Sequence, residues 1–444
     1  MERTCNQEEL AAQNSPDTQE SDPDADAVLN DSALEDLESY QHRQEFTTLD
    51  LLFDFPEPVT RSIPSGRGVA QWGPDYIPVS RKHISAWDDF TEKNINLMFH
   101  DFLLGREYRF QSTDLSLAYL RTRATLDDGP YTLRHVAQIS TWFTCDIWPV
   151  VDLAIGKSAE ELQERVNSGN VLQVAGGQER VDIPITKGNR TRVTRPKWIV
   201  YYEAAQDGES EEKQAPGEGP LQQPRRRWRP PPRRRPIVPC DFEEHMRFDP
   251  AELADPARMS QRVYAALGKT LMHCVHAKTR YAFVVSGDEV TLLRFYLVGG
   301  RREKYGVHYI VLPWAKMEGR VFAWKGIWAL VMLSLNDQHR PIASEDETRD
   351  LNDWARFEEK GQTVWANHIS KIVVADGEEA SDFHVVDAPR EEFAAQLAQY
   401  SEGQIAGSLT ATCQTVERKN GVTYRIATAP LERNALEARK RKWP

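Results

Sequence analysis

The sequence lacks the features that would assign it at once to a membrane, secreted or nucleotide-binding class. Its longest apolar run, residues 326–335, is far shorter than the ~20 residues that cross a bilayer, so we expect no membrane partner. The first residues, MERTCNQEEL, have no apolar segment typical of a signal peptide. The five cysteines form no CxxC pair, which argues against a zinc ribbon or a disulfide framework. The sequence contains neither a GxxxxGK[ST] motif nor a GxGxxG motif after a strand, so we expect neither a kinase nor a dehydrogenase, and no cofactor. The lack of a signal peptide and of paired cysteines predicts an intracellular, reducing compartment.

Acidic residues are concentrated in one part of the chain. The 55 Lys and Arg residues and 67 Asp and Glu residues give a formal net charge of -12. Residues 1–60 contain 16 acidic residues and two arginines, which leaves 53 basic and 51 acidic residues in 61–444. The acidic segment has few aromatic residues, and we predict a disordered tail over 1–80. The remaining chain is nearly neutral, so the net charge does not argue against a nucleic-acid partner.

One apolar segment stands out within the predicted tail. From Leu49 to Phe55, leucine and phenylalanine alternate with Asp50 and Asp54. Such a segment can fold as a short helix in the groove of a protein partner, which would make the chain an interaction or scaffold protein in transcriptional regulation or in a fungal gene cluster. Alternatively, the same side chains pack against the protein's own first domain.

Two basic clusters favour nuclear localisation and contact with nucleic acid. The first, PRRRWRPPPRRRP, occupies residues 224–236 at the end of a Pro-rich insertion, 206–236, that we predict to be disordered and extended. Its arginines can neutralise phosphates of DNA or RNA, and its tryptophan can stack on a base. The candidate nucleic-acid-binding residues are Arg225, Arg226, Arg227, Trp228, Arg229, Arg233, Arg234 and Arg235. The second cluster, RKRK at 439–442, begins a basic tail over 439–444.

The apolar patterns predict an α/β or α+β fold with a mixed sheet. Helical spacing covers residues 84–156, with Pro149 expected to kink or end a helix, and a further helix covers 158–166. A hairpin is predicted from 180–186 and 194–204, followed by a strand at 236–243, a helix at 258–277, a hairpin over 280–298, a strand at 308–315 and an apolar helix at 321–335. We therefore expect a helical N-terminal part and a core over 81–340. A β-rich extension, 341–438, would contain a hairpin over 407–428 with Asn420-Gly421 at its turn.

One succession of motifs carries a resemblance to a known family. RPKW at 195–198 opens a strand, PCDFE at 239–243 lies on the next, and a helix and the hairpin RYAFVVSGDEVTLLRF at 280–295 follow. This succession resembles the PD-(D/E)xK nuclease-like domains of uncharacterised fungal proteins, in which strands bearing roughly RPDW and PGDTK precede a helix and a similar hairpin. The resemblance covers about residues 130–340 and implies a restriction-endonuclease-like fold.

The family motif implies metal-assisted hydrolysis of a phosphodiester. Two carboxylates hold Mg²⁺, and a lysine orients the attacking water. This sequence departs from the motif, because Lys197 replaces the first carboxylate and Glu243 replaces the lysine, so that only Asp241 matches. One interpretation is a degenerate, salt-bridged site in a nuclear accessory protein that binds nucleic acid or protein partners and is not an enzyme. The alternative is an active, Mg²⁺-dependent nuclease in which Asp241 and Glu243 hold the metal and Lys197 serves as the lysine.

Other candidate ligands have weaker support. His273 and His276 lie within one helical turn, but no second pair at zinc-like spacing accompanies them. We therefore expect both histidines to take part in ordinary helix packing.

Overall fold

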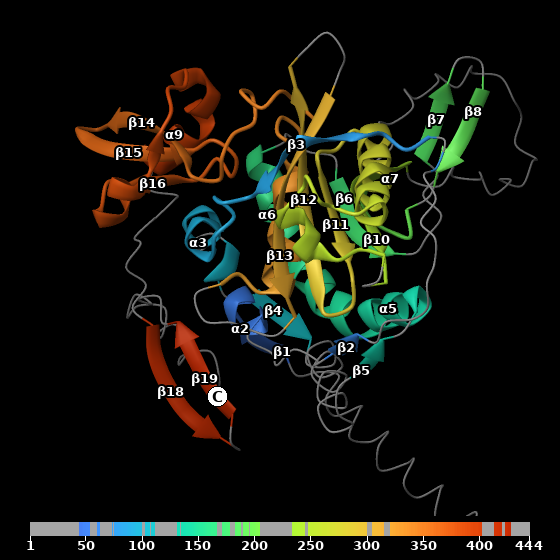
Figure 1. Cartoon of the computed structure of the whole chain (residues 1–444). Coiled ribbons are helices and arrows are strands. Elements are labelled where there is room, and N and C mark those ends of the chain that lie inside the picture. The colour runs from blue at the N-terminus through green and yellow to red at the C-terminus, as the bar shows by residue number, and fades with distance from the viewer. Residues whose placement is uncertain are drawn as a thin grey trace, which may run out of the picture.

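The chain folds around a mixed sheet flanked by helices. The computed structural model describes residues 44–53, 60–62, 73, 75–99, 103–106, 108–111, 131–133, 135–166, 171–177, 183–187, 190–194, 196–204, 233–244, 247–299, 304–314, 320–401, 413–419 and 422–427. Within these ranges the largest sheet has seven strands, and a four-stranded sheet follows toward the C-terminus (Figure 1). The predicted mixed α/β class is therefore confirmed. No helix in these ranges is long and apolar enough to cross a membrane.

The seven-stranded sheet contains both parallel and antiparallel pairs. In spatial order its strands are β3 (Val79–Ala86), β13 (Lys304–Pro313), β12 (Glu289–Val298), β11 (Tyr281–Val285), β10 (Arg233–Phe242), β9 (Trp198–Ala204) and β6 (Val171–Gly177). The β13–β3 and β10–β11 pairs are parallel, and the other neighbours are antiparallel. The strands predicted at 236–243, 280–298 and 308–315 are all present, whereas β6 and β3 were not predicted as strands.

The remaining described elements are helices and small sheets. The helices are α2 (Leu49–Phe53), α3 (Glu92–Phe99), α5 (Val136–Trp142), α6 (Trp148–Val166), α7 (Gln261–Ala277), α8 (Ala323–Leu335) and α9 (Ala394–Ser401), with a π-helical turn η2 (Phe143–Ile147) and 3-10 turns η3 (Pro250–Ala254), η4 (Glu378–Asp382) and η5 (Arg390–Phe393). The two-stranded sheets pair β1 (Gln44–Thr47) with β4 (Tyr108–Gln111), β2 (Thr60–Ser62) with β5 (Tyr131–Leu133), β7 (Ile183–Lys187) with β8 (Arg190–Thr194), and β18 (Cys413–Lys419) with β19 (Val422–Ala427).

Side-chain alternation along the central strands creates two apolar layers, one on each face of the sheet. On β11, Phe283 and Val285 belong to the cluster that includes α6 and α8, whereas Ala282 and Val284 belong to the cluster that includes α7 and η3. This alternation is the period of two that a pleated strand imposes. All 13 residues of α8 are buried, as expected for a helix that is apolar on every side.

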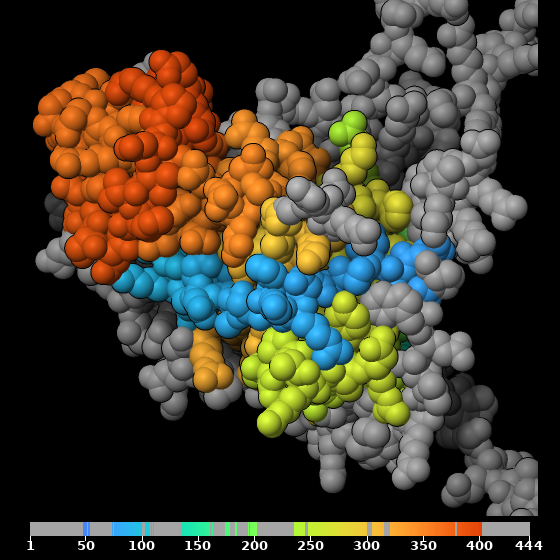
Figure 2. Space-filling view, turned by 45° about the horizontal axis from the view of Figure 1, so that its top comes forward, coloured from blue at the N-terminus to red at the C-terminus, as the bar shows by residue number. Residues whose placement is uncertain are grey.

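The edge strand β3 is held in place by side-chain contacts to the layer beneath it. Arg81 donates from Nη1 to the carbonyl oxygens of Pro256, at 3.1 Å, and Met259, at 2.9 Å. Figure 2 shows β3, in blue, crossing the face of the molecule between the C-terminal region, in orange and red, and the segment around η3, in yellow-green. Residues 79–86, the first of which the sequence assigned to the tail and the last to a helical region, therefore complete the central sheet.

The segment that begins at Leu49 is part of the fold. Leu49, Leu52 and Phe53 are at most 1% exposed, and Phe53 packs against Trp328 of α8. Lys325 of α8 joins this contact, because its Nζ atom lies 3.0 Å from Asp50 Oδ1. The structure thus shows self-packing, the second alternative given above, and corrects the tail predicted over 1–80. These buried side chains cannot contact a partner without unfolding α2, and Phe55 lies outside the described residues.

The predicted helical region, 84–156, contains the strands β4 and β5, whereas its last part is more continuously helical than the sequence suggested. α5, η2 and α6 follow one another without a break, and the predicted helix at 158–166 is the end of α6. In the π-helical turn, the Trp148 N–H donates to the carbonyl oxygen of Phe143, five residues earlier. Pro149 follows directly, so this wider turn absorbs a residue that has no N–H to donate. Of the two outcomes predicted for Pro149, a kink or the end of a helix, the second is wrong, because α6 continues through Pro149 to Val166.

The predicted hairpin at 180–204 is also corrected. β7 pairs with β8, not with the strand that begins at Trp198. Pro196 separates β8 from β9, and β9 enters the central sheet between β6 and β10. Proline has no N–H to donate to the ladder of a sheet and is therefore disfavoured within a strand, which explains the break.

The predicted Arg- and Pro-rich loop ends earlier than expected. Arg233, Arg234 and Arg235 belong to β10, where their backbones pair with Ala204, Glu203 and Tyr202 of β9. The expectation that the disordered insertion continues to residue 236 is therefore wrong for its last four residues. The other candidates, Arg225, Arg226, Arg227, Trp228 and Arg229, and the basic tail at 439–444, lie outside the described residues.

The C-terminal region contains a sheet of its own. Its strands, in spatial order, are β16 (Val373–Ala375), β15 (Gln362–Asn367), β14 (Asp353–Glu359) and β17 (His384–Val385). The predicted hairpin within 407–428 is present as β18 and β19, which form a separate two-stranded sheet, while its turn lies outside the described residues.

The four-stranded sheet is joined to the end of α8 by a polar junction. The Asn336 side chain donates to the Ile369 carbonyl oxygen at 2.7 Å, and His339 Nε2 lies 3.1 Å from the His368 carbonyl oxygen. Behind them, Lys371 forms an ion pair with Glu392. We call His339, His368, Lys371 and Glu392 the junction cluster.

Candidate functional site

Strand β10 carries an ionisable side chain into one of the two apolar layers. Cys240 and Phe242 belong to the layer that includes α6 and α8, so the pleat turns Asp241 between them toward α7. Asp241 is only 2% exposed. An unpaired carboxylate at this position would cost several kcal/mol, so it requires partners from α7.

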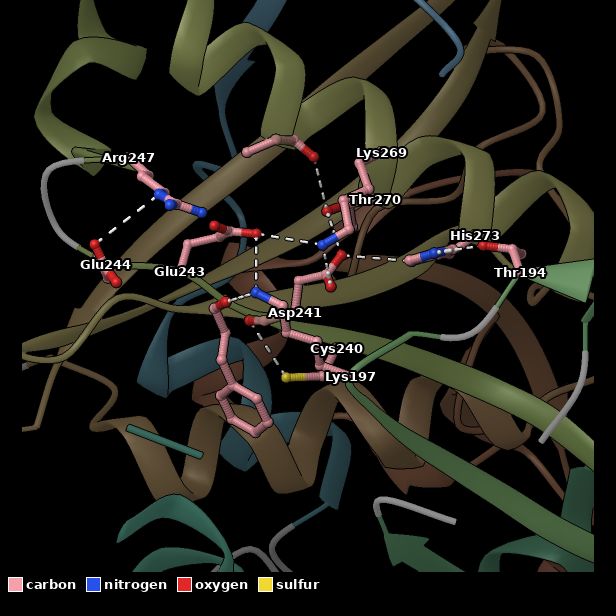
Figure 3. Close-up of polar contacts among 12 residues, drawn as sticks. Thr194, Lys197, Cys240, Asp241, Glu243, Glu244, Arg247, Lys269, Thr270 and His273 are labelled. Carbon is pink, nitrogen blue, oxygen red and sulfur yellow. Dashed lines mark hydrogen bonds and ion pairs between the residues drawn. The ribbon is translucent and has the colours of Figure 1, made fainter. Parts of the chain in front are cut away.

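Helix α7 supplies those partners from one face. Ser260 caps its N-terminus, and Lys269 and His273, four residues apart, lie on the same side of the helix. Lys269 Nζ lies 2.8 Å from Asp241 Oδ1, and His273 Nδ1 lies 3.4 Å from Asp241 Oδ2 (Figure 3). The His273 contact is an ion-pair distance without hydrogen-bond geometry, while the other ring nitrogen, Nε2, lies 3.0 Å from Thr194 Oγ1 at the end of β8.

Glu243 joins the same group from the end of β10. Its backbone N–H donates to the Val285 carbonyl oxygen at 3.0 Å, which prolongs the parallel pairing with β11 by one residue. Its Oε1 atom lies 3.3 Å from Lys269 Nζ and 3.2 Å from Lys197 Nζ. Lys197, just before β9, also donates to the Phe242 carbonyl oxygen. Two carboxylates and two ammonium groups therefore alternate across β9, β10 and α7, and we call these four residues the ion-pair cluster.

The electrostatics of the cluster keep its buried members charged. Burial alone raises the pKa of Asp241, but the charges of Lys269 and His273 outweigh it and hold that pKa well below its ordinary value. Burial lowers the pKa of Lys269, but Asp241 and Glu243 more than reverse this effect and raise it above its ordinary value. Next to them, burial and the Asp241 charge raise the pKa of the Cys240 thiol, which disfavours the thiolate.

The structure brings the three predicted site residues together and adds Lys269, His273 and Thr270, whose hydroxyl donates to Asp241 Oδ2 at 3.5 Å. Asp241 and Glu243 lie at the C-terminal end of β10. Lys197 lies beside them, because it precedes the antiparallel strand β9, in which Trp198 pairs with Cys240. Lys269 and His273 were not predicted as members of this site. A pattern in the sequence could have predicted them, because Lys269 and His273 are four residues apart on the first long amphipathic helix after the strand of Asp241. His276, the other histidine considered as a zinc ligand, is not a member of this cluster.

The cluster is a poor cage for a metal ion as it stands. Mg²⁺ binds oxygens at about 2.1 Å, so two oxygens that share it lie within roughly 4.2 Å of each other. Asp241 Oδ1 and Glu243 Oε1 both contact Lys269 Nζ instead, at 2.8 Å and 3.3 Å. Among the residues that the structure describes, no group of three or more His, Cys, Asp or Glu side chains is arranged to hold a metal ion. The ammonium of Lys269 occupies the position that a shared cation would need.

Comparison of the chain with models of protein families, with curated protein sequences and with solved structures finds no significant match.

Proposed function

We propose that this chain is a catalytically inactive protein with a PD-(D/E)xK-like, restriction-endonuclease-like core, which acts in the nucleus as an accessory factor that binds nucleic acid. The proposed lack of catalysis is supported by the position of Lys269 Nζ, which contacts both the Asp241 and the Glu243 carboxylates. A bound Mg²⁺ would have to displace an ammonium group that both carboxylates stabilise.

Binding to nucleic acid is supported by the sequence of the insertion. Seven arginines lie between Arg225 and Arg235, interrupted only by one tryptophan and three prolines. Such a segment gains affinity for phosphates by releasing counterions, without needing a fixed conformation. The same cluster and the RKRK sequence at 439–442 support entry into the nucleus.

The lack of catalysis is tested by nicking of supercoiled plasmid in Mg²⁺ or Mn²⁺. We expect the wild-type protein, Asp241→Ala and a surface control, Asp346→Ala, all to leave the plasmid intact. Titration calorimetry should likewise show no saturable binding of Mg²⁺ to the folded wild type. Metal-dependent cleavage by the wild type that persists in Asp346→Ala and disappears in Asp241→Ala would overturn the proposal.

One observation favours an active nuclease as the second candidate. Lys197 Nζ lies 3.2 Å from Glu243 Oε1, so a lysine and the two acidic residues do converge. In that case Asp241 and Glu243 would hold Mg²⁺ after Lys269 moves, and Lys197 would orient the attacking water. Lys197→Ala would then abolish cleavage while the melting temperature of the protein changed little, because Lys197 is about one-third exposed.

A further inference from the structure

A two-stranded ribbon, β7 and β8, stands apart from the central sheet. Figure 1 shows it at the periphery of the molecule, on the side of α7 and away from the four-stranded C-terminal sheet. Ile183 and Thr194, the register partners at one end of the ribbon, attach it to the rest of the fold. Ile183 is buried in a small cluster with Ile199, Tyr201 and Ala277, and Thr194 Oγ1 lies 3.0 Å from His273 Nε2. The ribbon is therefore an anchored element of secondary structure with a defined attachment.

The ribbon and its connection to β9 are basic. From residue 183 to residue 202 the sequence contains five Lys or Arg residues and no Asp or Glu. Three of these, Lys187, Arg190 and Arg192, lie on the two strands themselves. The register pairs Lys187 with Arg190 and places Arg192 opposite Ile185, on the same face as Ile183 and Thr194. The register partners Lys187 and Arg190 therefore lie at the end of the ribbon that is distant from Ile183.

The two strands of the ribbon carry basic residues and no acidic ones. Lys187 and Arg190 are register partners, and Arg192 lies two residues further along β8. An anionic partner is therefore complementary in charge to the ribbon.

We infer that the β7–β8 ribbon is the element that docks this protein on double-stranded DNA. The inference rests on the nucleic-acid binding proposed above and names the surface responsible. The major groove of B-DNA is about 12 Å wide and admits a two-stranded ribbon, whereas the major groove of A-form RNA is too narrow to be read by side chains. Each strand of the ribbon has five residues, or roughly 17 Å, which matches the scale of the groove.

The ribbon and the arginine-rich insertion are separate attachment points. The ribbon joins β9 at its beginning, near Lys197, whereas Arg233 of β10 pairs with Ala204 at the other end of β9. A duplex seated on the ribbon would therefore be contacted independently of the insertion. Because Lys197 follows the ribbon by three residues, the duplex would also lie near the ion-pair cluster, without requiring that cluster to cleave it.

The inference is tested with the full chain and a fluorescent duplex of 20 base pairs, by anisotropy across a series of salt concentrations. The variant combines Lys187→Gln, Arg190→Gln and Arg192→Gln. Losing three phosphate contacts should weaken binding on the order of tenfold or more near 0.1 M salt and make the slope of log K against log salt shallower by about 2.7. The conservative variant Arg190→Lys with Arg192→Lys should retain the wild-type slope.

The control removes the same charge from the opposite edge of the central sheet. Lys82→Gln, Lys304→Gln and Arg258→Gln affect exposed residues on β3, at the start of β13 and after η3, and should leave the affinity within twofold of wild type. Equal melting temperatures of the two triple variants would show that both are folded.

The possible failures are distinguishable. If the wild type binds the duplex and the ribbon variant binds equally well, the ribbon inference is wrong and the proposed function stands. If the wild type binds single-stranded DNA or double-stranded RNA as tightly as duplex DNA, docking in the major groove is wrong. If the wild type binds no nucleic acid, the proposed function itself fails.

Discussion

Two largely buried lysines of this protein, Lys269 and Lys371, have pKa values shifted in opposite directions by their surroundings. Lys269 of α7 contacts two carboxylates, Asp241 and Glu243, and its pKa is raised. Lys371, in the junction cluster, is buried and contacts one carboxylate, Glu392; burial and the nearby Arg349 outweigh that contact, and its pKa is lowered. The number of carboxylates within reach, relative to the neighbouring cations, decides whether a buried ammonium group stabilises the fold as an ion.

The ion-pair cluster and the junction cluster differ in their balance of charge. The ion-pair cluster is balanced in charge and buries Asp241 almost completely. The junction cluster has a single carboxylate beside Lys371, Arg349 and two histidines, and the pKa of both histidines is lowered, first by burial and then by these cations. We therefore expect substitutions in the ion-pair cluster to change the free energy of unfolding most strongly. We expect the contribution of the junction cluster to that free energy to change with pH.

The largest effect is expected from Lys269→Met. The substitution keeps the length of the side chain but leaves the buried Asp241 carboxylate without its closest cation. Breaking a buried pair in this way costs on the order of 3–5 kcal/mol of the free energy of unfolding, which urea denaturation measures. Combining it with Asp241→Leu should restore part of this loss, because the pair is then removed as a whole. A double variant less stable than Lys269→Met would contradict the ion-pair interpretation.

A smaller effect is expected from acid acting on the junction cluster. Burial and the charges of Lys371 and Arg280 lower the pKa of His339 from 6.5 to about 4. The unfolded chain therefore takes up the proton first, so the stability contributed by neutral His339 is present above pH 6.5 and is lost as the pH falls toward 4. Allowing for the partial exposure of His339, we expect the free energy of unfolding to fall on the order of 2 kcal/mol between pH 7 and pH 4.5.

The matched variant for this prediction is His339→Gln, which keeps an N–H donor for the His368 carbonyl oxygen. Urea denaturation at both pH values should show a smaller pH dependence in the variant than in the wild type. The lowered pKa of Asp241 keeps that carboxylate ionised over the whole range, so the titration of Asp241 does not explain the difference. An unchanged pH dependence in the variant would mean that other groups cause it.

The smallest effect is expected from Lys325→Met. Lys325 is buried and, like Lys269, has two acidic neighbours, since Asp50 Oδ1 lies 3.0 Å and Glu92 Oε1 3.5 Å from its Nζ atom. Both carboxylates are about one-third exposed, so water can solvate them after the ammonium group is removed. We expect a loss of about 1 kcal/mol or less in urea denaturation. A loss as large as that of Lys269→Met would show that the exposure of the carboxylates does not explain the difference.

The candidate site was predictable where it depends on neighbouring strands. Asp241 and Glu243 lie two residues apart on one strand, and Lys197 precedes the strand that pairs with it, so their proximity follows from local pattern. The contribution of Lys269 was not predictable in the same way. It depends on which face of α7 packs on β10, and this orientation is set by apolar residues along the helix and not by the lysine itself.

The fold was predictable where short-range signals agree, as in the β11–β12 hairpin around Ser286, Gly287 and Asp288. It was not predictable where a residue far along the chain decides the outcome. Strand β3 has a mixed sequence, VSRKHISA, and becomes a strand because β13 offers it a parallel edge. Pro196 was a local signal for the break between β8 and β9, and reading it would have given the correct hairpin.

The pairing of β3 with β13 has a consequence for the order in which the protein acquires its structure. Val79 is a register partner of Tyr305, so more than 200 residues separate the two sides of this ladder. During synthesis β3 leaves the ribosome long before its neighbour exists, and the contact between Asp50 and Lys325 spans a still longer distance. Contacts so remote in sequence slow folding, because a long loop must close before they form. Strand β3 therefore remains without its partner until β13, the last strand of the central sheet, has been synthesised, and during this interval its unpaired edge exposes the nascent protein to aggregation.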